Sequence, residues 1–310
     1  MKRESGFTAL EVIFVLTAIT IIFAFVLPDL SEFYRWQKRK ENEKQVEKIR
    51  SAIERIYDMY AYDVDSYDGQ EFRFGSNTIT SGTTGTSFYS VSSYAGMSQK
   101  AVGRDVYNME YTAYVSNRLA STTSPQVQYH VIAFVSKSTD SKLSSLFDAS
   151  EGKLTCGSDD ICAEVSGLEI QVSKYKETLK KMDDTGNTFQ SYFTTLYLAD
   201  PNHDVNVDRF AKTDRNGASV PTKWDTNSHL LNSCTVADDC IATLNDINAI
   251  STLKFNPEQI KDAWGNEFRV DNGSSSTRNP DNGETSPYSI RILTTTPWGE
   301  TIVKTVFGVY

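Results

Sequence analysis

The sequence has few of the residues on which most enzyme active sites depend. Its 310 residues include only three histidines and four cysteines, and it contains no HExxH motif, no phosphate-binding loop and no nucleophile motif. It also lacks an excess of positive charge. The formal net charge is −9, which argues against a surface that binds the phosphates of nucleic acid. We therefore expect a protein that is not an enzyme, has no cofactor and does not bind nucleic acid.

Long hydrophobic runs are also scarce, and the exception lies at residues 7–27. Glu11 is the only ionisable side chain in this run, which is long enough to cross a bilayer core of ~30 Å as a helix. A carboxylate within such a segment needs a partner and is by default a functional candidate. Cleavage after Gly6 would create an amino group on Phe7, close enough in sequence to pair with Glu11 of a neighbouring copy.

The residues around this run resemble a known family. A short basic leader (MKRESG), then Phe7, Glu11 and Pro28 at family spacing, resemble the class III signal of type IV prepilins and of type II secretion pseudopilins. The resemblance covers about the first 60 residues. It implies cleavage between Gly6 and Phe7, N-methylation of Phe7, and assembly through Glu11 and Pro28. An ordinary membrane anchor or secretory signal is the alternative, but a secretory signal has a shorter apolar region with its cleavage site after that region.

The resemblance also implies where the protein acts and with what. We expect the chain in the bacterial inner membrane before assembly, with its head in the periplasm, and afterwards in a periplasmic or cell-surface filament. The expected partners are a prepilin peptidase, other pilin or pseudopilin subunits bound through the N-terminal helix, and an inner-membrane assembly platform.

The cysteines agree with an exported head, because they form two pairs with the same spacing. Cys156 and Cys162 enclose GSDDI, and Cys234 and Cys240 enclose TVADD. An even cysteine number in an exported domain predicts disulfides. Four cysteines allow three connectivities, of which we favour the two local ones. Structural zinc is an alternative, but its ligand pairs are usually closer in sequence and only His229 is near. Reactive thiols are the remaining alternative.

Periodicity predicts the main elements of the head. Apolar residues at helical spacing predict that the N-terminal helix continues to Tyr60. The same spacing predicts a second helix at residues 161–182, which stops near Gly186, and a third at residues 241–250. Residues 127–135 predict a central strand that contains His130, which we interpret as a core residue. Residues 288–294 and 301–310 predict a terminal hairpin.

Two loops are weak candidates for calcium. Asp204, Asn206 and Asp208 alternate as in calcium loops, but Arg209 stands where an EF-hand needs glycine, and we favour a solvated acidic loop. The stretch KDAWGNEFRV (261–270) resembles the one that opens the C-terminal sheet of major pseudopilins. In those relatives the following loop can bind calcium, and here it offers Asp271 and Asp281.

Together these features predict an α+β, pilin-like fold. We expect a leader at residues 1–6, followed by a long N-terminal spine helix at 7–62. This helix is transmembrane over 7–27 and packs on an antiparallel sheet. An inserted α/β region at 63–255 enlarges the head, and a C-terminal β region covers 256–310. The expected function is that of a structural subunit, and a minor one because of its large head, of a type IV pilus or a type II secretion pseudopilus. A tip-located adhesin or ligand-binding pilin is the alternative.

Overall fold

The structure is a computed structural model that describes most of the chain. The described residues are 9–66, 72–75, 78–81, 86–137, 142–205, 209–210, 241–245, 253, 255–271 and 287–310. Within these ranges, the side chains of residues 9, 22–29, 72–90 and 241–242 are not described.

The chain divides into two compact units, each assembled from separate stretches of sequence. The first contains Met1–Arg55, Arg73–Val115 and Ile132–Val165. The second contains Ile56–Phe72, Ser116–Val131 and Ser166–Tyr310.

The first unit combines most of a long helix with short strands. The helix is α1 (Ala9–Met59), and two short helices follow later in the chain, α3 (Val91–Ala95) and α4 (Gln99–Gly103). The central sheet has the order β10-β7-β4, formed by Ile161–Ser166, Val131–Ser136 and Thr112–Val115. Two smaller sheets comprise β1 (Phe72–Gly75), β2 (Thr78–Ser81) and β3 (Thr86–Ser90), and β8 (Leu146–Asp148) paired with β9 (Lys153–Thr155).

The central strand predicted at residues 127–135 is present only in part, because β7 begins at Val131, residues 128 and 129 form the separate strand β6 (Gln128–Tyr129), and His130 lies between the two strands. All six residues of β7 are buried, as expected of a strand covered on both faces. The apolar stripe predicted along α1 is also present, because Val46, Ile49 and Ile53 are fully or almost fully buried. Beside it, the amide of Asn42 donates a hydrogen bond of 2.8 Å to the hydroxyl of Ser136 at the end of β7.

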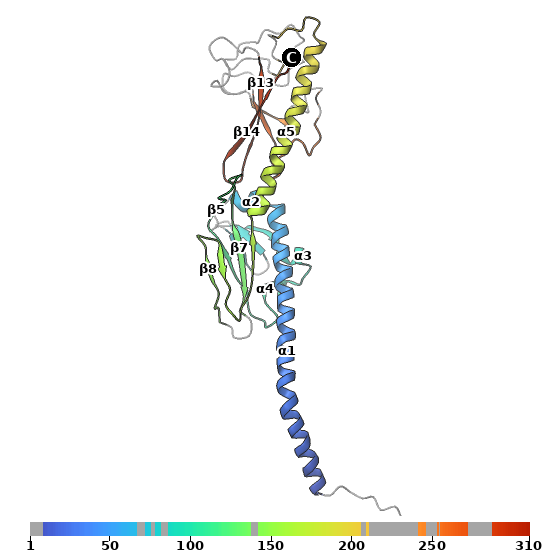
Figure 1. The fold of residues 1–310 in the computed structure, drawn as a ribbon, viewed down its shortest axis with the longest axis vertical. Helices are drawn as coiled ribbons and strands as arrows, with labels where there is room; N and C mark the ends of the chain where they lie inside the picture. The colour runs from blue at the N-terminus through green and yellow to red at the C-terminus, as the bar shows by residue number, and fades with distance from the viewer. Residues whose placement is uncertain are drawn as a thin grey trace, which may run out of the picture. The chain divides into compact units, whose positions relative to one another are not determined.

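The second unit is organised around the helix α5 (Leu168–Ala199), which Figure 1 shows beside β13 (Ser289–Thr295) and β14 (Thr301–Phe307). These two strands form the predicted terminal hairpin and belong to a sheet of order β11-β12-β13-β14, completed by Ile241–Thr243 and Arg269–Asp271. The unit also holds α2 (Ala61–Ser66), β5 (Leu119–Ala120) and β6 (Gln128–Tyr129). Its core is rich in aromatic rings, among them Phe189, Phe193 and Phe268.

The predicted fold class is wrong, although the antiparallel sheets and the α+β composition are present. It required a spine helix that crosses a membrane in its first half and packs on one antiparallel sheet. Among the described residues, no helix combines the length and the apolar character that crossing a membrane demands. The strands form several separate sheets instead of one.

Two local predictions also need correction. Residues 161–166 form the strand β10, and the helix begins only at Leu168. The spacing of four between Ile161 and Val165 is a multiple of two, so it fits one face of a strand as well as a helix. The helix then continues past Gly186, where an added Cβ would lie 3.0 Å from the side chain of Val306 on β14. Glycine therefore permits a close approach of helix and sheet.

Residues 241–243 likewise form a strand where a helix was expected, because they pair with β12 in antiparallel register. Residues 246–250 of that expected helix lie outside the described part of the chain.

Candidate functional site

The most unusual surface of the described chain is the apolar segment of α1, which we define as residues 10–21. Its large side chains are exposed, with Leu10 at 78% and Phe14 at 74%. Val12, Ile13, Val15, Leu16, Ile19 and Ile21 are exposed as well. Exposed positions run consecutively from 12 to 16, and each residue turns the helix by about 100°, so every side of the helix is uncovered. A helix that is apolar all round is normally buried in a larger assembly or a membrane.

Both predicted assembly residues, Glu11 and Pro28, belong to α1, but only Glu11 lies in the apolar segment. Glu11 lies in the first turn of α1, where a negative charge is favourable because it faces the positive end of the helix dipole. Pro28 lies within α1, and its side chain is not described. Gly6 and Phe7, the predicted cleavage site, lie outside the described residues.

Beyond the apolar segment, α1 changes to aromatic and then charged residues. Phe33 stacks on Trp36 with ring centroids 6.1 Å apart, and both rings are exposed. Further on, Lys40 pairs with Glu43 at 2.7 Å and Arg50 pairs with Glu47 at 2.8 Å. The hydrogen bond from Lys40 lowers the pKa of Glu43. These ion pairs are exposed, and each contributes at most about 1 kcal/mol.

One of the two local disulfides expected from the sequence is present. Cys156 and Cys162 form a disulfide that closes a short loop between Cys156 and the start of β10, to which Cys162 belongs; by loop-closure entropy this contributes about 2 kcal/mol. Asp160 inside this loop accepts hydrogen bonds from the hydroxyls of Ser144 and Ser145, at 2.9 and 2.6 Å. Cys234, Cys240 and His229 lie outside the described residues.

At the first calcium candidate, the side chain of an arginine supplies the positive charge that a calcium ion would otherwise provide. Arg209 is only 2% exposed; it donates to a carboxylate oxygen of Asp200 at 2.9 Å and to the backbone carbonyl of Asp204 at 3.2 Å. Its guanidinium group also lies over the rings of Phe193 and Tyr197. A buried positive charge at this point disfavours a metal ion. The other two candidates, Asn206 and Asp208, are not described.

At the second calcium candidate, Asp271 is also held by an arginine. Both of its carboxylate oxygens accept hydrogen bonds from Arg291 on the neighbouring strand, at 2.7 and 2.6 Å, so this side chain completes a cross-strand ion pair. Asp281 lies outside the described residues. Within the described part of the chain, no group of three or more His, Cys, Asp or Glu side chains is arranged to hold a metal ion.

The stretch that resembles major pseudopilins forms a tight turn. A carboxylate oxygen of Asp262 accepts from the backbone N–H groups of Trp264 and Asn266, at 2.9 and 2.8 Å. Gly265 has a φ of 93°, which favours glycine. The other oxygen of Asp262 accepts from the hydroxyl of Thr294 at 2.6 Å, so the turn is fixed to β13.

A buried polar network that sequence reasoning missed lies in the second unit. Asp65 is completely buried and accepts hydrogen bonds from the phenol of Tyr57, at 2.7 and 2.8 Å. Nδ1 of His130 lies 2.6 Å from the same carboxylate. Burial, together with the charge of Asp65, raises the pKa of Tyr57 well above its usual value, so the phenol keeps its proton and acts as a donor.

Helix α5 and the Asp262 turn complete this network. The amide of Gln171 donates to Asp65 and to the carbonyl of Ala61, and the indole N–H of Trp264 donates to Gln171 at 2.7 Å. Gly167 permits the arrangement, because an added Cβ would lie 2.0 Å from the Tyr57 oxygen. The network is closed to solvent at Asp65, His130 and Tyr57, so it stabilises the unit and offers no entry for a substrate.

No signal in the sequence pointed to this network, since its members are far apart in the chain and carry no motif. His130 alone was interpreted correctly, as a core residue. Comparison of the chain with protein-family profiles, with curated proteins and with solved structures finds no match.

Proposed function

We propose that this protein is a subunit of a filament of the type IV pilin class, either a pilus or a type II secretion pseudopilus. The observation that carries the proposal is the apolar segment of α1, whose side chains are exposed on every side. An exposed apolar surface of this kind is normally buried against another molecule. In the proposed filament, the apolar N-terminal helices of other subunits bury it, so assembly proceeds through this segment.

One further observation supports the proposal. The disulfide Cys156–Cys162 agrees with a head that folds in an oxidising compartment such as the periplasm. We further propose that the subunit is a minor one, because a chain of 310 residues has a bulky head that would crowd its neighbours in a regular polymer.

The proposed processing is directly testable. We expect the mature protein to begin at Phe7 with a methylated amino group, because the family resemblance places the cleavage site at Gly6. Intact-mass and N-terminal peptide mass spectrometry of the protein from its native host measures this. Gly6→Val should block cleavage, since it adds a branched side chain beside the scissile bond, whereas the control Ser5→Val should be cleaved normally. A mature chain that begins at Met1 or after residue 27 would contradict the proposal.

A further inference from the structure

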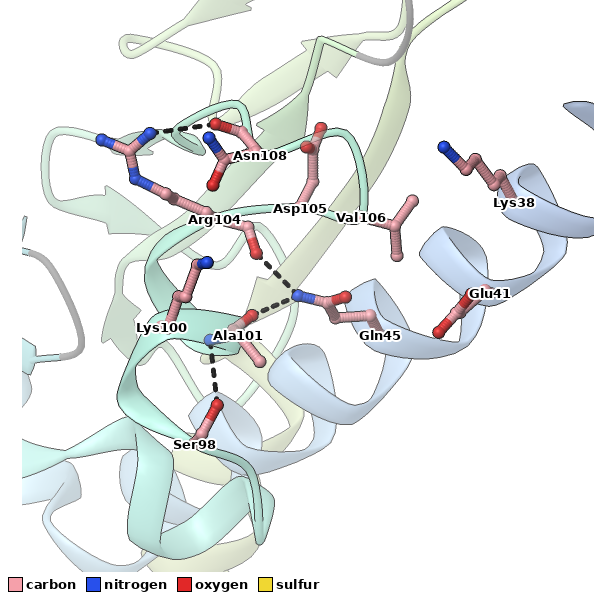
Figure 2. A pocket seen from close by; sticks show the side chains of 10 residues that line it. All are labelled: Lys38, Glu41, Gln45, Ser98, Lys100, Ala101, Arg104, Asp105, Val106 and Asn108. Carbon is pink, nitrogen blue, oxygen red and sulfur yellow. Dashed lines mark hydrogen bonds between the residues drawn. The ribbon is translucent and has the colours of Figure 1, made fainter.

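Two surfaces of the described chain are not used by the filament proposal. One is a polar pocket between α1 and the segment that contains α4 and the loop after it (Figure 2). Lysine side chains and the carboxylates of Glu41 and Asp105 line it together, so its charge favours no single class of ligand. The other surface is the outer edge of the C-terminal sheet, which is formed by β14. This edge presents hydrogen-bonding groups in a regular order.

The outer edge of β14 carries backbone groups that β13 does not bind. Strand β14 has β13 on one side and no described strand on the other. The N–H of Gly308 donates to the carbonyl of Tyr288 at 2.8 Å, and the two strands pair without a register shift. Hydrogen-bonded pairs alternate in an antiparallel ladder, so the even-numbered residues of β14 bind β13. The odd-numbered residues direct their N–H and C=O groups outward; they are Thr301, Val303, Thr305 and Phe307.

These four outward residues are exposed and uncharged. Val303 is 47% exposed and Phe307 is 52% exposed, and both threonines are exposed as well. None of the four forms a backbone hydrogen bond across this edge with another residue of the described ranges. Edge strands that stay unpaired usually carry a lysine, a proline or a bulge that prevents pairing. The outward positions of β14 have none of these.

The even-numbered residues of β14 face the opposite side, against α5. Ile302 and Val306 are each only 6% exposed, and an added Cβ on Gly186 of α5 would lie 3.0 Å from Val306. Lys304 forms an ion pair with Asp183 of α5. The core contacts of β14 therefore use one set of residues and the open edge uses the other, so a further strand can pair with this edge without breaking a core contact.

We propose that the outer edge of β14 pairs with β14 of a second copy of this chain, antiparallel and about a two-fold axis at Thr305. Thr305 then faces Thr305 of the second copy, and Val303 faces its Phe307. Each of these facing pairs exchanges two backbone hydrogen bonds. The exposed apolar side chains cover one another as cross-strand pairs, which stabilises the ladder. The interface is isologous, because the same residues act on both sides.

The side chains of β14 select this register over its two neighbours. With the axis at Lys304, two ammonium groups would lie directly opposite each other, and like charges so placed are destabilising. With the axis at Val306, Phe307 would face a threonine, and the two exposed apolar side chains would no longer cover each other. A second copy is the occupant that the edge fits, since β14 itself offers the matching uncharged row.

Sedimentation of the full chain in detergent, over a range of protein concentrations, tests the pairing. We expect a monomer–dimer equilibrium with a dissociation constant on the order of 10 μM. Thr305→Pro should weaken it by about thirtyfold, because it removes the outward N–H from both copies, whereas the bonds to β13 remain. Thr305→Ser keeps this N–H and should dimerise as wild type does.

Further variants separate this interface from other causes of association. Thr305→Lys keeps the outward N–H but places two ammonium groups opposite each other, so it should weaken the dimer by about fivefold or more. Phe14→Ala, in the apolar segment of α1, should leave the dimer unchanged. A wild-type chain that stays monomeric at ~100 μM, a dimer that neither Thr305→Pro nor Thr305→Lys weakens, or equal loss of the dimer in Phe14→Ala would overturn the proposal.

Cysteine cross-linking locates the two-fold axis. Thr305→Cys should form a disulfide between two copies under mild oxidation, because facing residues of a hydrogen-bonded pair have Cα atoms about 5.5 Å apart, which a disulfide can bridge. Thr295→Cys is the control, since Thr295 is an exposed residue of β13, away from the edge; it should give no such bond. Equal cross-linking at both positions, or stronger cross-linking of Lys304→Cys than of Thr305→Cys, would contradict the proposed pairing.

Discussion

Replacing Glu11 with alanine is expected to abolish incorporation of the protein into filaments while leaving the head folded. In the proposed assembly, the apolar segment of α1 is surrounded by the helices of other subunits. A carboxylate in such surroundings must be paired, and the Phe7 amino group of a neighbour supplies a cation. Loss of one partner of a buried ion pair costs about 3 to 5 kcal/mol, so the fraction of subunits in filaments should fall by on the order of a hundredfold or more.

Immunoblots of sheared filaments and of cell-associated protein measure this fraction. Glu32→Ala is the matched control, since Glu32 is an exposed glutamate of the same helix beyond the apolar segment; it should assemble normally. The urea midpoint of both variants should equal that of wild type. Assembly of Glu11→Ala at the wild-type level would show that Glu11 only stabilises the first turn of α1.

The second large effect concerns stability. Asp65→Ala is expected to lower the free energy of unfolding by about 3 to 5 kcal/mol, because it leaves the buried donors of Tyr57, Gln171 and His130 without their acceptor. Urea denaturation of the full chain, followed by circular dichroism, measures the change in midpoint at constant slope.

Asp63→Ala provides the control for this experiment. Asp63 lies on the same short helix α2, but partial burial raises its pKa, which means that folding disfavours its charged form. At neutral pH, removing this charge should leave stability at or slightly above the wild-type value. If Asp65→Ala unfolds within about 1 kcal/mol of wild type, the network is not the stabilising feature that its geometry indicates.

Local patterns in the sequence identified several elements of the fold. The pattern of residues 288–294 and 301–310 correctly indicated the hairpin of β13 and β14, and the apolar run at residues 127–135 indicated the central strand β7. The spacing of Cys156 and Cys162 indicated the disulfide that the structure contains. In each case the signal lies within a few residues, where period and chain geometry act directly.

The incorrect predictions concern segments whose local pattern fits two kinds of structure, or whose structure depends on residues far away in the sequence. Residues 161–166 fit both periods, and pairing with β7 decided for a strand. The apolar run at 7–27 seemed sufficient for a membrane-spanning spine, yet no described helix meets that requirement. The acidic loop before Arg209 resembled a cation site, but the arginine itself interacts with the acidic side chain of Asp200.

Neither the Asp65 network nor the polar pocket beside α1 (Figure 2) could be predicted from the sequence. Asp65 and His130 are 65 positions apart, and the pocket joins α1 to a loop that follows α4. Such sites form only when the chain folds, and no periodicity or motif marks their members in advance.

Photo-crosslinking from the apolar segment of α1 tests the central claim most directly. A photoreactive phenylalanine analogue in place of Phe14, which is 74% exposed in the isolated chain, should form covalent adducts in assembled filaments, and mass spectrometry should identify the partner as the N-terminal helix of another pilin subunit. The same analogue at Lys176, an exposed position of α5, should give no adduct with that helix. Adducts of position 14 only with its own chain, only with lipid or with no partner at all would contradict assembly through α1.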